Sequence, residues 1–529
     1  MTTFSSRMRI GLYSAFPFRP HVEHLAWLGV LARAAGHEVV GLSCDGSSTT
    51  CYSRELLKRS RMHCIACTAS GLRAFPDFTI RTARGRNKAQ SPNRDFRPQV
   101  ITSVRSIMRL EDPRELDAPE PQAMADRMVG AMSQTYSAIK NWIETDQLDA
   151  LLVFNGRMDL TRAAILAAAD SEIPFVTVER GSFDTGLRIF PGADCQALRH
   201  EHRLQREYAE RPLLRGQALV AASLLARRVL NRPISEWRTY NSARARMGWP
   251  GNGSGLKVLI GPSSRYEMEG EPERELAGDP REIIDRALAI LGAVPGNVVV
   301  RGHPVWAEPI AGWSGNSSTR YYGDWCKRMG YCFIPSEHTI DSLGLMQDAD
   351  VVISSGGTIG LEAASLGRPT ISIAPCFYAE SGCVINWPDG DLKEKFESMR
   401  QLRPVEISQR ALRALYTHIN RFTQFVGFAR PVAGAMGALW EYRNGATFDP
   451  VASALQTGWV GACDSEWSES TDQEARIANA LVGGHFEEVL QEATLNTVVL
   501  SEWQQLPLNR WATPLVQLRM IIRKGDRLG

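Results

Sequence analysis

Residues 351–374, with the sequence VVISSGGTIGLEAASLGRPTISIA, decide the fold class of this chain. The first four residues form an apolar run typical of a buried strand, and a Ser-Ser-Gly-Gly-Thr turn follows them. The spacing then predicts a helix over 358–366 and a second strand over 370–374. Because a strand, a helix and a strand in close succession form a parallel crossover, the stretch predicts an α/β protein.

The same alternation continues in both directions along the chain. In the first half it predicts strands over 9–14, 38–42, 150–154 and 174–178 and helices over 22–33, 122–144, 161–170 and parts of 201–246. In the second half it predicts strands over 258–261, 298–301 and 331–334 and a helix over 281–291. Gly251, Gly253 and Gly255 separate the two series, so we expect a bilobed enzyme of two α/β units with a central cleft.

The domain boundaries follow from these patterns. We expect an N-terminal domain at 1–250, with a cysteine- and arginine-rich insertion at about 44–110, and a C-terminal domain at 251–450. No strand alternation is evident from 451 to 529. Thr471 and Glu474 have the spacing of a capping box at a helix start, so we expect a small helical appendage there.

Composition excludes several classes of protein. The chain has 529 residues, of which 44% are hydrophobic and 22% charged, so collagen-like and largely disordered chains are excluded. The 60 basic and 58 acidic residues give a formal charge of +2, so we expect no nucleic-acid partner. No segment has the roughly 18 to 20 apolar residues of a membrane-spanning helix. The apolar run after Arg9 meets Pro17 and Arg19 too early for a signal peptide, so we expect a cytoplasmic protein.

Four of the ten cysteines lie close together in the insertion. Cys44, Cys51, Cys64 and Cys67 form a C-x6-C-x12-C-x2-C pattern. Four thiolates suit a tetrahedral structural Zn2+, although the spacing matches no common zinc finger. The alternative is four small buried thiols in an irregular segment.

The insertion is also strongly basic. Between Ser53 and Met108 there are twelve Lys and Arg residues against three acidic ones. Such a surplus attracts anionic lipid headgroups, which predicts peripheral association with the inner face of the cytoplasmic membrane. A solvated basic insertion without a partner is the alternative.

The turn after the strand at 351–354 is a candidate phosphate site. Gly356 and Gly357 allow a ligand to approach the backbone closely. The following helix begins at Thr358, and the N–H groups at its start can donate hydrogen bonds to a phosphate. Ser355 adds a hydroxyl, and Glu362, one turn into the helix, suits ribose hydroxyls. A G-x-G-x-x-G spacing is missing, which argues against a dinucleotide. Glycine turns of this kind also occur where no ligand binds.

A second motif, Arg301-Gly302-His303-Pro304, follows the strand at 298–301. The carboxyl ends of strands are where open α/β sheets bind ligands. Arg301 and His303 at positions i and i+2 project to the same side, where they suit an anionic phosphate or carboxylate. A structural histidine is the alternative.

Together, the Arg-Gly-His-Pro motif and residues 354–369 resemble the GT-B glycosyltransferases of capsule and surface polysaccharide biosynthesis, and most closely the retaining Kdo-transferase type that uses a CMP-sugar. The resemblance covers about 8–400. It implies two facing Rossmann-like domains, of which the C-terminal one holds the nucleotide-sugar donor and the N-terminal one holds a glycan or glycolipid acceptor. It also implies that there is no catalytic metal.

The N-terminal sheet edge carries candidate catalytic and acceptor residues. Asn155 and Arg157 follow one buried strand, and Glu179 ends the next, so all three reach the same edge. Glu179 is our candidate acid/base residue, with an ion pair to Arg180 as its structural alternative. Three residues near the first helix are expected either to contact acceptor hydroxyls or to cap the helix: His21, Glu23 and His24.

The loop after the strand at 258–261 supplies the last group of candidates. Ser263 and Ser264 suit phosphate or carboxylate, and Glu267 is our candidate nucleophile for a retaining transfer. Glu269 and Glu271 are nearby alternatives for the nucleophile. The non-catalytic alternative is that these residues form a solvated acidic loop.

The sequence therefore predicts a cytoplasmic nucleotide-sugar glycosyltransferase acting on a surface glycan. Two enzymes on similar scaffolds remain as alternatives, a glycerophosphotransferase and a nucleotide-sugar epimerase. A non-catalytic scaffold of a polysaccharide export complex is the third.

Overall fold

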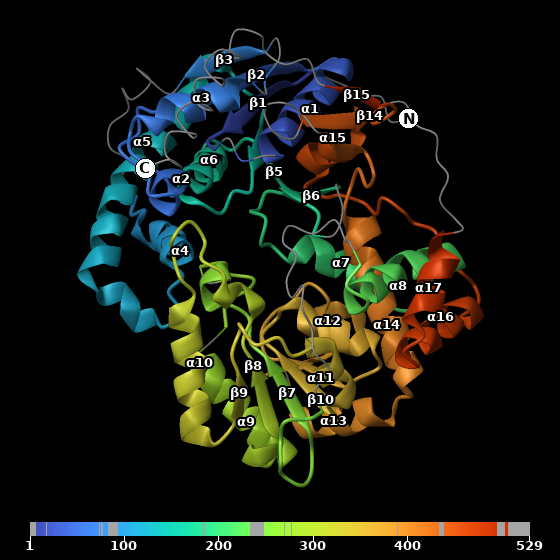
Figure 1. Ribbon diagram of the computed structural model, residues 1–529. Coiled ribbons are helices and arrows are strands. Elements are labelled where there is room, and N and C mark those ends of the chain that lie inside the picture. Colours follow the sequence, from blue (N-terminus) through green and yellow to red (C-terminus); the bar gives the residue numbers. More distant parts are fainter. Residues whose placement is uncertain are drawn as a thin grey trace.

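The structure is a computed structural model of the chain (Figure 1). It describes residues 7–16, 18, 20–73, 75, 78–82, 94–182, 186–232, 248–268, 270–276, 278–388, 390–432, 439–494 and 503–505. Glu269 and the larger part of 495–529 lie outside the described residues.

The first sheet is mainly parallel. Within the described residues it has six strands in the order β3-β2-β1-β4-β5-β6, of which only β6 is antiparallel to its neighbour. The strands are β1 (Arg9–Ser14), β2 (Glu38–Ser43), β3 (Thr79–Thr82), β4 (Ala150–Phe154), β5 (Phe175–Arg180) and β6 (Leu187–Pro191).

The second sheet repeats this topology with parallel neighbours throughout. Its described strands lie in the order β9-β8-β7-β10-β11-β12, so in each sheet the third, second and first strands are followed by the fourth, fifth and sixth. This is the strand order of a Rossmann fold. The predicted pair of Rossmann-like domains in a GT-B architecture is therefore confirmed. The strands are β7 (Val258–Gly261), β8 (Val298–Arg301), β9 (Cys332–Ile334), β10 (Val351–Ser354), β11 (Thr370–Ser372) and β12 (Ile385–Asn386).

Helices cover both faces of each sheet (Figure 1). In the first sheet, side chains alternate between the faces, so that Leu12 and Leu152 meet α1, whereas Tyr13 and Val153 meet α4, α5 and α6. The helices of the first half are α1 (His21–Ala34), α2 (Tyr52–Leu56), α3 (His63–Arg73), α4 (Arg97–Met108), η1 (Pro113–Asp117), α5 (Pro119–Asp146), α6 (Asp159–Asp170), α7 (Arg199–Tyr208) and α8 (Arg215–Val229). Those of the second half are η2 (Arg265–Glu267), α9 (Pro280–Leu291), η3 (Pro295–Asn297), η4 (Pro304–Ala307), α10 (Asn316–Met329), α11 (Ser342–Asp348), α12 (Thr358–Ser365), η5 (Ala379–Ser381), α13 (Leu392–Gln401), α14 (Pro404–Tyr416), η6 (Thr417–Phe422), α15 (Asp449–Thr457), α16 (Asp472–Val482) and α17 (Phe486–Thr494).

The two halves exchange segments, which shifts the packing away from the boundaries expected at 250 and 450. Leu219, Ala222 and Leu225 of α8 precede residue 250, yet they lie in one core cluster with Val258 and Ile260 of the second sheet. Burial of their apolar side chains ties α8 to the C-terminal half.

The segment from Phe425 to Val460 returns to the N-terminal half. A small antiparallel sheet of β13 (Ala429–Val432), β14 (Leu439–Arg443) and β15 (Trp503–Gln505) lies beside α1 (Figure 1). Trp27 of α1 stacks on Tyr442 of β14, with ring centroids 4.8 Å apart. Val451 and Leu455 of α15 join the same core cluster. The short β15 is a strand in the tail where the sequence predicted none.

The tail also contains α16 and α17, which pack beside α8 and α14 (Figure 1). Thr471 precedes α16 as the spacing indicates, but its side chain makes no capping hydrogen bond. Glu474 is instead fully buried, where it pairs with Arg413 at 2.7 Å and accepts a hydrogen bond from the Leu213 N–H at 3.0 Å. Its function is to join α16 to α14 and α8. None of the described helices combines the length and hydropathy of a membrane span.

Candidate functional site

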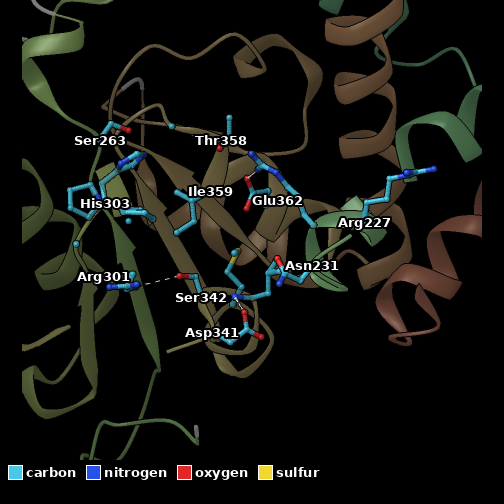
Figure 2. Close-up of a pocket in the computed structure, with 18 of the residues that line it drawn as sticks. Arg227, Asn231, Ser263, Arg301, His303, Asp341, Ser342, Thr358, Ile359 and Glu362 are labelled. Carbon is cyan, nitrogen blue, oxygen red and sulfur yellow. Dashed lines mark hydrogen bonds and ion pairs between the residues drawn. The ribbon is translucent and has the colours of Figure 1, made fainter. Parts of the chain in front are cut away.

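A pocket of about 180 Å3 lies at the carboxyl end of the second sheet (Figure 2). β8 and β9 lie on one side of β7, whereas β10, β11 and β12 lie on its other side. The strand order therefore reverses between β7 and β10. Ligands of open α/β sheets bind at such a reversal. Three segments predicted from the sequence meet here: Gly261–Ser263 after β7, Arg301–Pro304 after β8, and Gly357–Ile359 at the start of α12.

The end of α8 forms another wall of the pocket. Arg227, Arg228 and Arg232 line it together with Arg301, against two carboxylates, Asp341 and Glu362. The pocket therefore carries a net positive charge among its lining side chains, and the first N–H groups of α12 add to it. Such a pocket suits a phosphate-bearing ligand. The α8 arginines were not predicted, because no motif marks them and only the tertiary packing of α8 brings them here.

His303 is held as a neutral hydrogen-bond donor. Its Nδ1 accepts from the Val305 N–H at 3.2 Å, which leaves the ring proton on Nε2. Burial, and then the positive charges of Arg301, Arg109 and Arg228, lower the pKa of His303 to about 4. The ring is thus uncharged at neutral pH.

Arg301 faces the loop after β9. Its guanidinium donates to Pro335 O, to His338 O at 2.9 Å and to Ser342 Oγ at 3.3 Å (Figure 2). Burial lowers its pKa to about 10, so the group stays charged. Its positive charge reaches the pocket, but its donors are engaged with the loop that leads into α11.

Glu362 points into the pocket and forms an ion pair with Arg228 (Figure 2). The pair joins α12 to the end of α8. A carboxylate at this place still suits ribose hydroxyls, provided that Arg228 turns to another anion.

The turn at Gly356 and Gly357 packs closely against neighbouring segments of the chain. A Cβ on Gly357 would lie 2.5 Å from Ser263 Oγ. Gly356 has φ +84°, and a Cβ there would lie 2.9 Å from Pro375 O. Gly356 therefore requires glycine because of its positive φ and a backbone contact within the chain, whereas a side chain at Gly357 would displace the Ser263 hydroxyl. The sequence had suggested close approach of a ligand instead.

Three of the predicted serines, Ser263, Ser264 and Ser355, line an adjoining pocket of about 50 Å3. Ser264 Oγ accepts from the Trp306 indole N–H at 2.8 Å. The buried Ser355 Oγ has no hydrogen-bond partner among the residues that the structure describes. Ser263 lines both pockets, which makes them neighbours.

On the N-terminal side, Glu179 and Asn155 lie together as predicted. Asn155 Nδ2 donates to Glu179 Oε2 at 2.8 Å, and Asn155 adopts φ +66°, which an asparagine tolerates. His21 Nδ1 lies 3.6 Å from Glu179 Oε1, and burial lowers the pKa of His21. Glu179 Oε1 also accepts a hydrogen bond from the Arg180 N–H at 3.0 Å.

The other two residues of the first helix are buried at 6% exposure or less. His24 Nδ1 lies 2.9 Å from Tyr442 Oη, and burial holds the pKa of His24 well below its usual value. Its contacts are therefore with the sheet that covers α1. Glu23 is likewise enclosed, and neither caps the helix, which begins after Pro20 without a side-chain cap.

Arg157 connects the two halves. Its Nη2 donates to Tyr266 O at 2.8 Å and to Ser106 Oγ at 3.0 Å, which brings the loop after β4 against the loop after β7. Glu267 adjoins this contact and is exposed. Glu271, its alternative, is buried beside Asp194, and burial raises the pKa of Glu271 to about 8. A carboxyl held protonated is a poor nucleophile at neutral pH.

Arg109 is a contact between the halves that the sequence did not reveal. It follows α4 with φ +59° and is 1% exposed. Its guanidinium donates to Val305 O, to Glu308 O and, at 3.2 Å, to Trp313 O, and Nε donates to Tyr266 Oη at 3.2 Å. The N-terminal half thereby holds the segment that follows His303.

The four clustered cysteines are the candidate zinc ligands of the sequence. Among the described residues, which include all four, no group of three or more His, Cys, Asp or Glu side chains is arranged to hold a metal ion. Burial raises the pKa of Cys44 to about 11 and that of Cys51 well above its usual value, so both stay protonated thiols. The structural zinc that the spacing suggests stays a prediction.

Comparison with known proteins gives only distant likenesses. A family described as proteins of unknown function, DUF354, matches residues 327–386, and no curated protein matches the chain. A β-Kdo 2,4-transferase, KpsC, from Thermosulfurimonas dismutans is 16% identical over 64% of this chain and 88% of its own, with a TM-score of 0.32. The UDP-GlcNAc 2-epimerase of Neisseria meningitidis is 14% identical over 76% and 94%, with a TM-score of 0.26. At these values the likenesses identify no function.

Proposed function

We propose that the chain is a glycosyltransferase that uses a nucleotide-sugar donor. The observation that supports this most is the cationic pocket at the reversal of the second sheet, where Arg228, His303 and the start of α12 converge. The phosphate of the donor binds there, and the positive charge stabilises the phosphate as it leaves. Glu362 exchanges Arg228 for the ribose hydroxyls when the donor binds.

The N-terminal half holds the acceptor in this proposal. Glu179, aligned by Asn155, acts as acid/base residue toward the acceptor hydroxyl. Glu267 stays our proposed nucleophile for a retaining transfer, because Glu271 is held protonated. We propose CMP-Kdo as donor and a capsule or lipopolysaccharide-type glycan as acceptor.

We further propose that the insertion binds an anionic membrane surface. Met62 and Ile65 are 80% and 63% exposed, the highest values among the exposed large hydrophobic side chains of the described residues. Lys58 and Arg61 beside them are also exposed. Exposed apolar side chains can insert into a bilayer, and basic side chains next to them are attracted to its negatively charged surface. Each basic side chain contributes about 1 kcal/mol to the free energy of binding.

A nucleotide panel tests the assignment. CMP, UDP and CDP are compared by thermal shift, and nucleotide release is then followed from CMP-Kdo, UDP-sugars and CDP-glycerol with a glycan acceptor. Transfer of sugar supports the proposal. Release from CDP-glycerol alone indicates the glycerophosphotransferase, conversion of UDP-GlcNAc without acceptor indicates the epimerase, and a chain that binds no nucleotide is a scaffold.

Two variants of the pocket sharpen this test. Arg228→Ala is expected to weaken nucleotide binding by about 10- to 150-fold, because it removes a charge-assisted hydrogen bond of about 1.5–3 kcal/mol. The matched control is Arg320→Ala, an exposed arginine of α10 that pairs with Glu115 outside the pocket. Glu362→Gln separates two roles: binding weakens if Glu362 holds the ribose and strengthens if it only neutralises Arg228.

A further inference from the structure

Away from the phosphate pocket, His418 joins a serine and a glutamate from distant parts of the chain. Its Nδ1 lies 2.7 Å from Glu201 Oε1, and its Nε2 lies 3.2 Å from Ser182 Oγ. Ser182 follows β5, Glu201 lies in the first turn of α7, and His418 lies in η6. Each residue thus comes from a different element.

The carboxylate fixes the tautomer of the ring. A carboxylate oxygen can only accept, so Nδ1 carries the ring proton toward Glu201 and Nε2 is left as the acceptor of the Ser182 hydroxyl. Glu201 and His418 are 3% and 2% exposed, and the His418 ring stacks on Phe377 at 4.0 Å. The base is therefore oriented by a buried carboxylate and held by packing, which are the roles of a serine–histidine–acid triad.

The surroundings also suit a reactive group. Ser182 is only partly buried and lies three residues after Glu179, at the carboxyl end of β5. His418 belongs to a π-helix, a form that is rare and frequent at functional sites, because its extra residue re-aims side chains. A purely structural link between β5 and α7 would not require the serine to stay accessible.

We propose that Ser182 is a nucleophile toward acyl esters, activated by His418 and Glu201. Ser182 Oγ attacks the ester carbonyl carbon while its proton passes to His418 Nε2, and the same proton then leaves with the alcohol as the C–O bond breaks. Water attacks the acyl-Ser182 ester, gives one proton to His418 and releases the carboxylic acid, and that proton returns to Ser182 Oγ. This activity is independent of the proposed sugar transfer.

A fluorophosphonate probe tests the nucleophile without knowledge of the ester. Attack by Ser182 Oγ forms an O–P bond, expels fluoride and transfers the proton to His418, and mass spectrometry of the full-length chain locates the adduct. Ser182→Ala should abolish it. His418→Gln should slow its formation by about 10²–10⁴-fold, the usual contribution of a general base. Glu201→Gln, which keeps the shape, should slow it as well.

Ser223→Ala is the matched control, because Ser223 is another half-buried serine whose hydroxyl donates to a carbonyl, Val220 O. It should leave labelling unchanged. Circular dichroism checks that the His418 and Glu201 variants fold. Hydrolysis of p-nitrophenyl acetate that is lost with Ser182→Ala would further support the proposal. An unlabelled Ser182, or labelling that neither His418→Gln nor Glu201→Gln alters, would overturn it and leave the three residues a structural brace.

Discussion

Replacing Arg109 with methionine should loosen the segment that follows His303. The change keeps most of the volume but removes the guanidinium that donates to Val305 O, Glu308 O and Trp313 O. Val305 O and Trp313 O still accept from the backbone N–H groups of Glu308 and Ile310, so the loss is that of three hydrogen bonds from the guanidinium. At about 1 kcal/mol net for each hydrogen bond, the total is about 3 kcal/mol. When reclosing is faster than exchange, that corresponds to amide exchange about 150-fold faster.

Hydrogen exchange followed by mass spectrometry measures this directly. The peptide over 304–313 contains amides that are hydrogen-bonded within the segment, such as those of Glu308, which donates to Val305 O, and Trp313, which donates to Ile310 O. Arg114→Met is the matched control, since Arg114 is 82% exposed and pairs with its near neighbour Asp112. Unchanged exchange over 304–313 in the Arg109 variant, or the same acceleration in the control, would refute the reasoning.

Three further predictions concern other parts of the chain. Because the pKa of Glu271 is raised to about 8 in the folded state, the folded chain holds a proton that the unfolded chain loses, so stability should fall as pH rises toward 8. The free energy of unfolding, measured with urea across that pH range, should depend less on pH in Glu271→Gln. The same pH dependence in both proteins would contradict this. Gly356→Ala should destabilise the chain by about 1–3 kcal/mol, because alanine is strained at this positive φ. By contrast, Gly130→Ala in α5, where a Cβ meets nothing, should stabilise it by about 0.5–1 kcal/mol, so melting temperatures shifting in the same direction would refute the argument. Replacing Met62 and Ile65 with serine should reduce sedimentation with phosphatidylglycerol vesicles by about tenfold or more, since apolar insertion is lost; equal binding to phosphatidylcholine vesicles would count against the proposed charge attraction.

The buried strands could be predicted from the sequence almost residue by residue. The strands at 9–14, 150–154, 258–261, 298–301 and 351–354 match the structure at both ends. Each is a short apolar run bounded by turn residues, which is how a strand buried on both faces appears. Edge strands show this signal less well. Three of them were missed, namely β3, with the sequence TIRT, β6, and β12, of two residues, whereas the edge strand β9 was predicted.

The candidate site divides in the same way. His303, Thr358 and Glu362 were predicted because strand ends and helix starts place them from local sequence alone. The α8 arginines and Arg109 reach their places through packing between the halves, which no local pattern reports. His24 shows the opposite case. The sequence suggested that it contacts the acceptor, but in the structure it is covered by β14, which lies more than 400 residues later in the chain. His418 and Glu201, 217 positions apart, are joined only by folding.

The exchange of segments between the halves has a consequence for biosynthesis. During synthesis from the N-terminus, the sheet around Ile10 and Leu12 emerges from the ribosome long before Phe448, Val451 and Leu455, which complete its core. The apolar side chains of α8 likewise have no packing partner until the strands of the second sheet have been synthesised. The nascent chain must therefore keep apolar surface exposed for most of its translation, a state in which aggregation competes with folding. Expression of either half alone would make that transient exposure permanent.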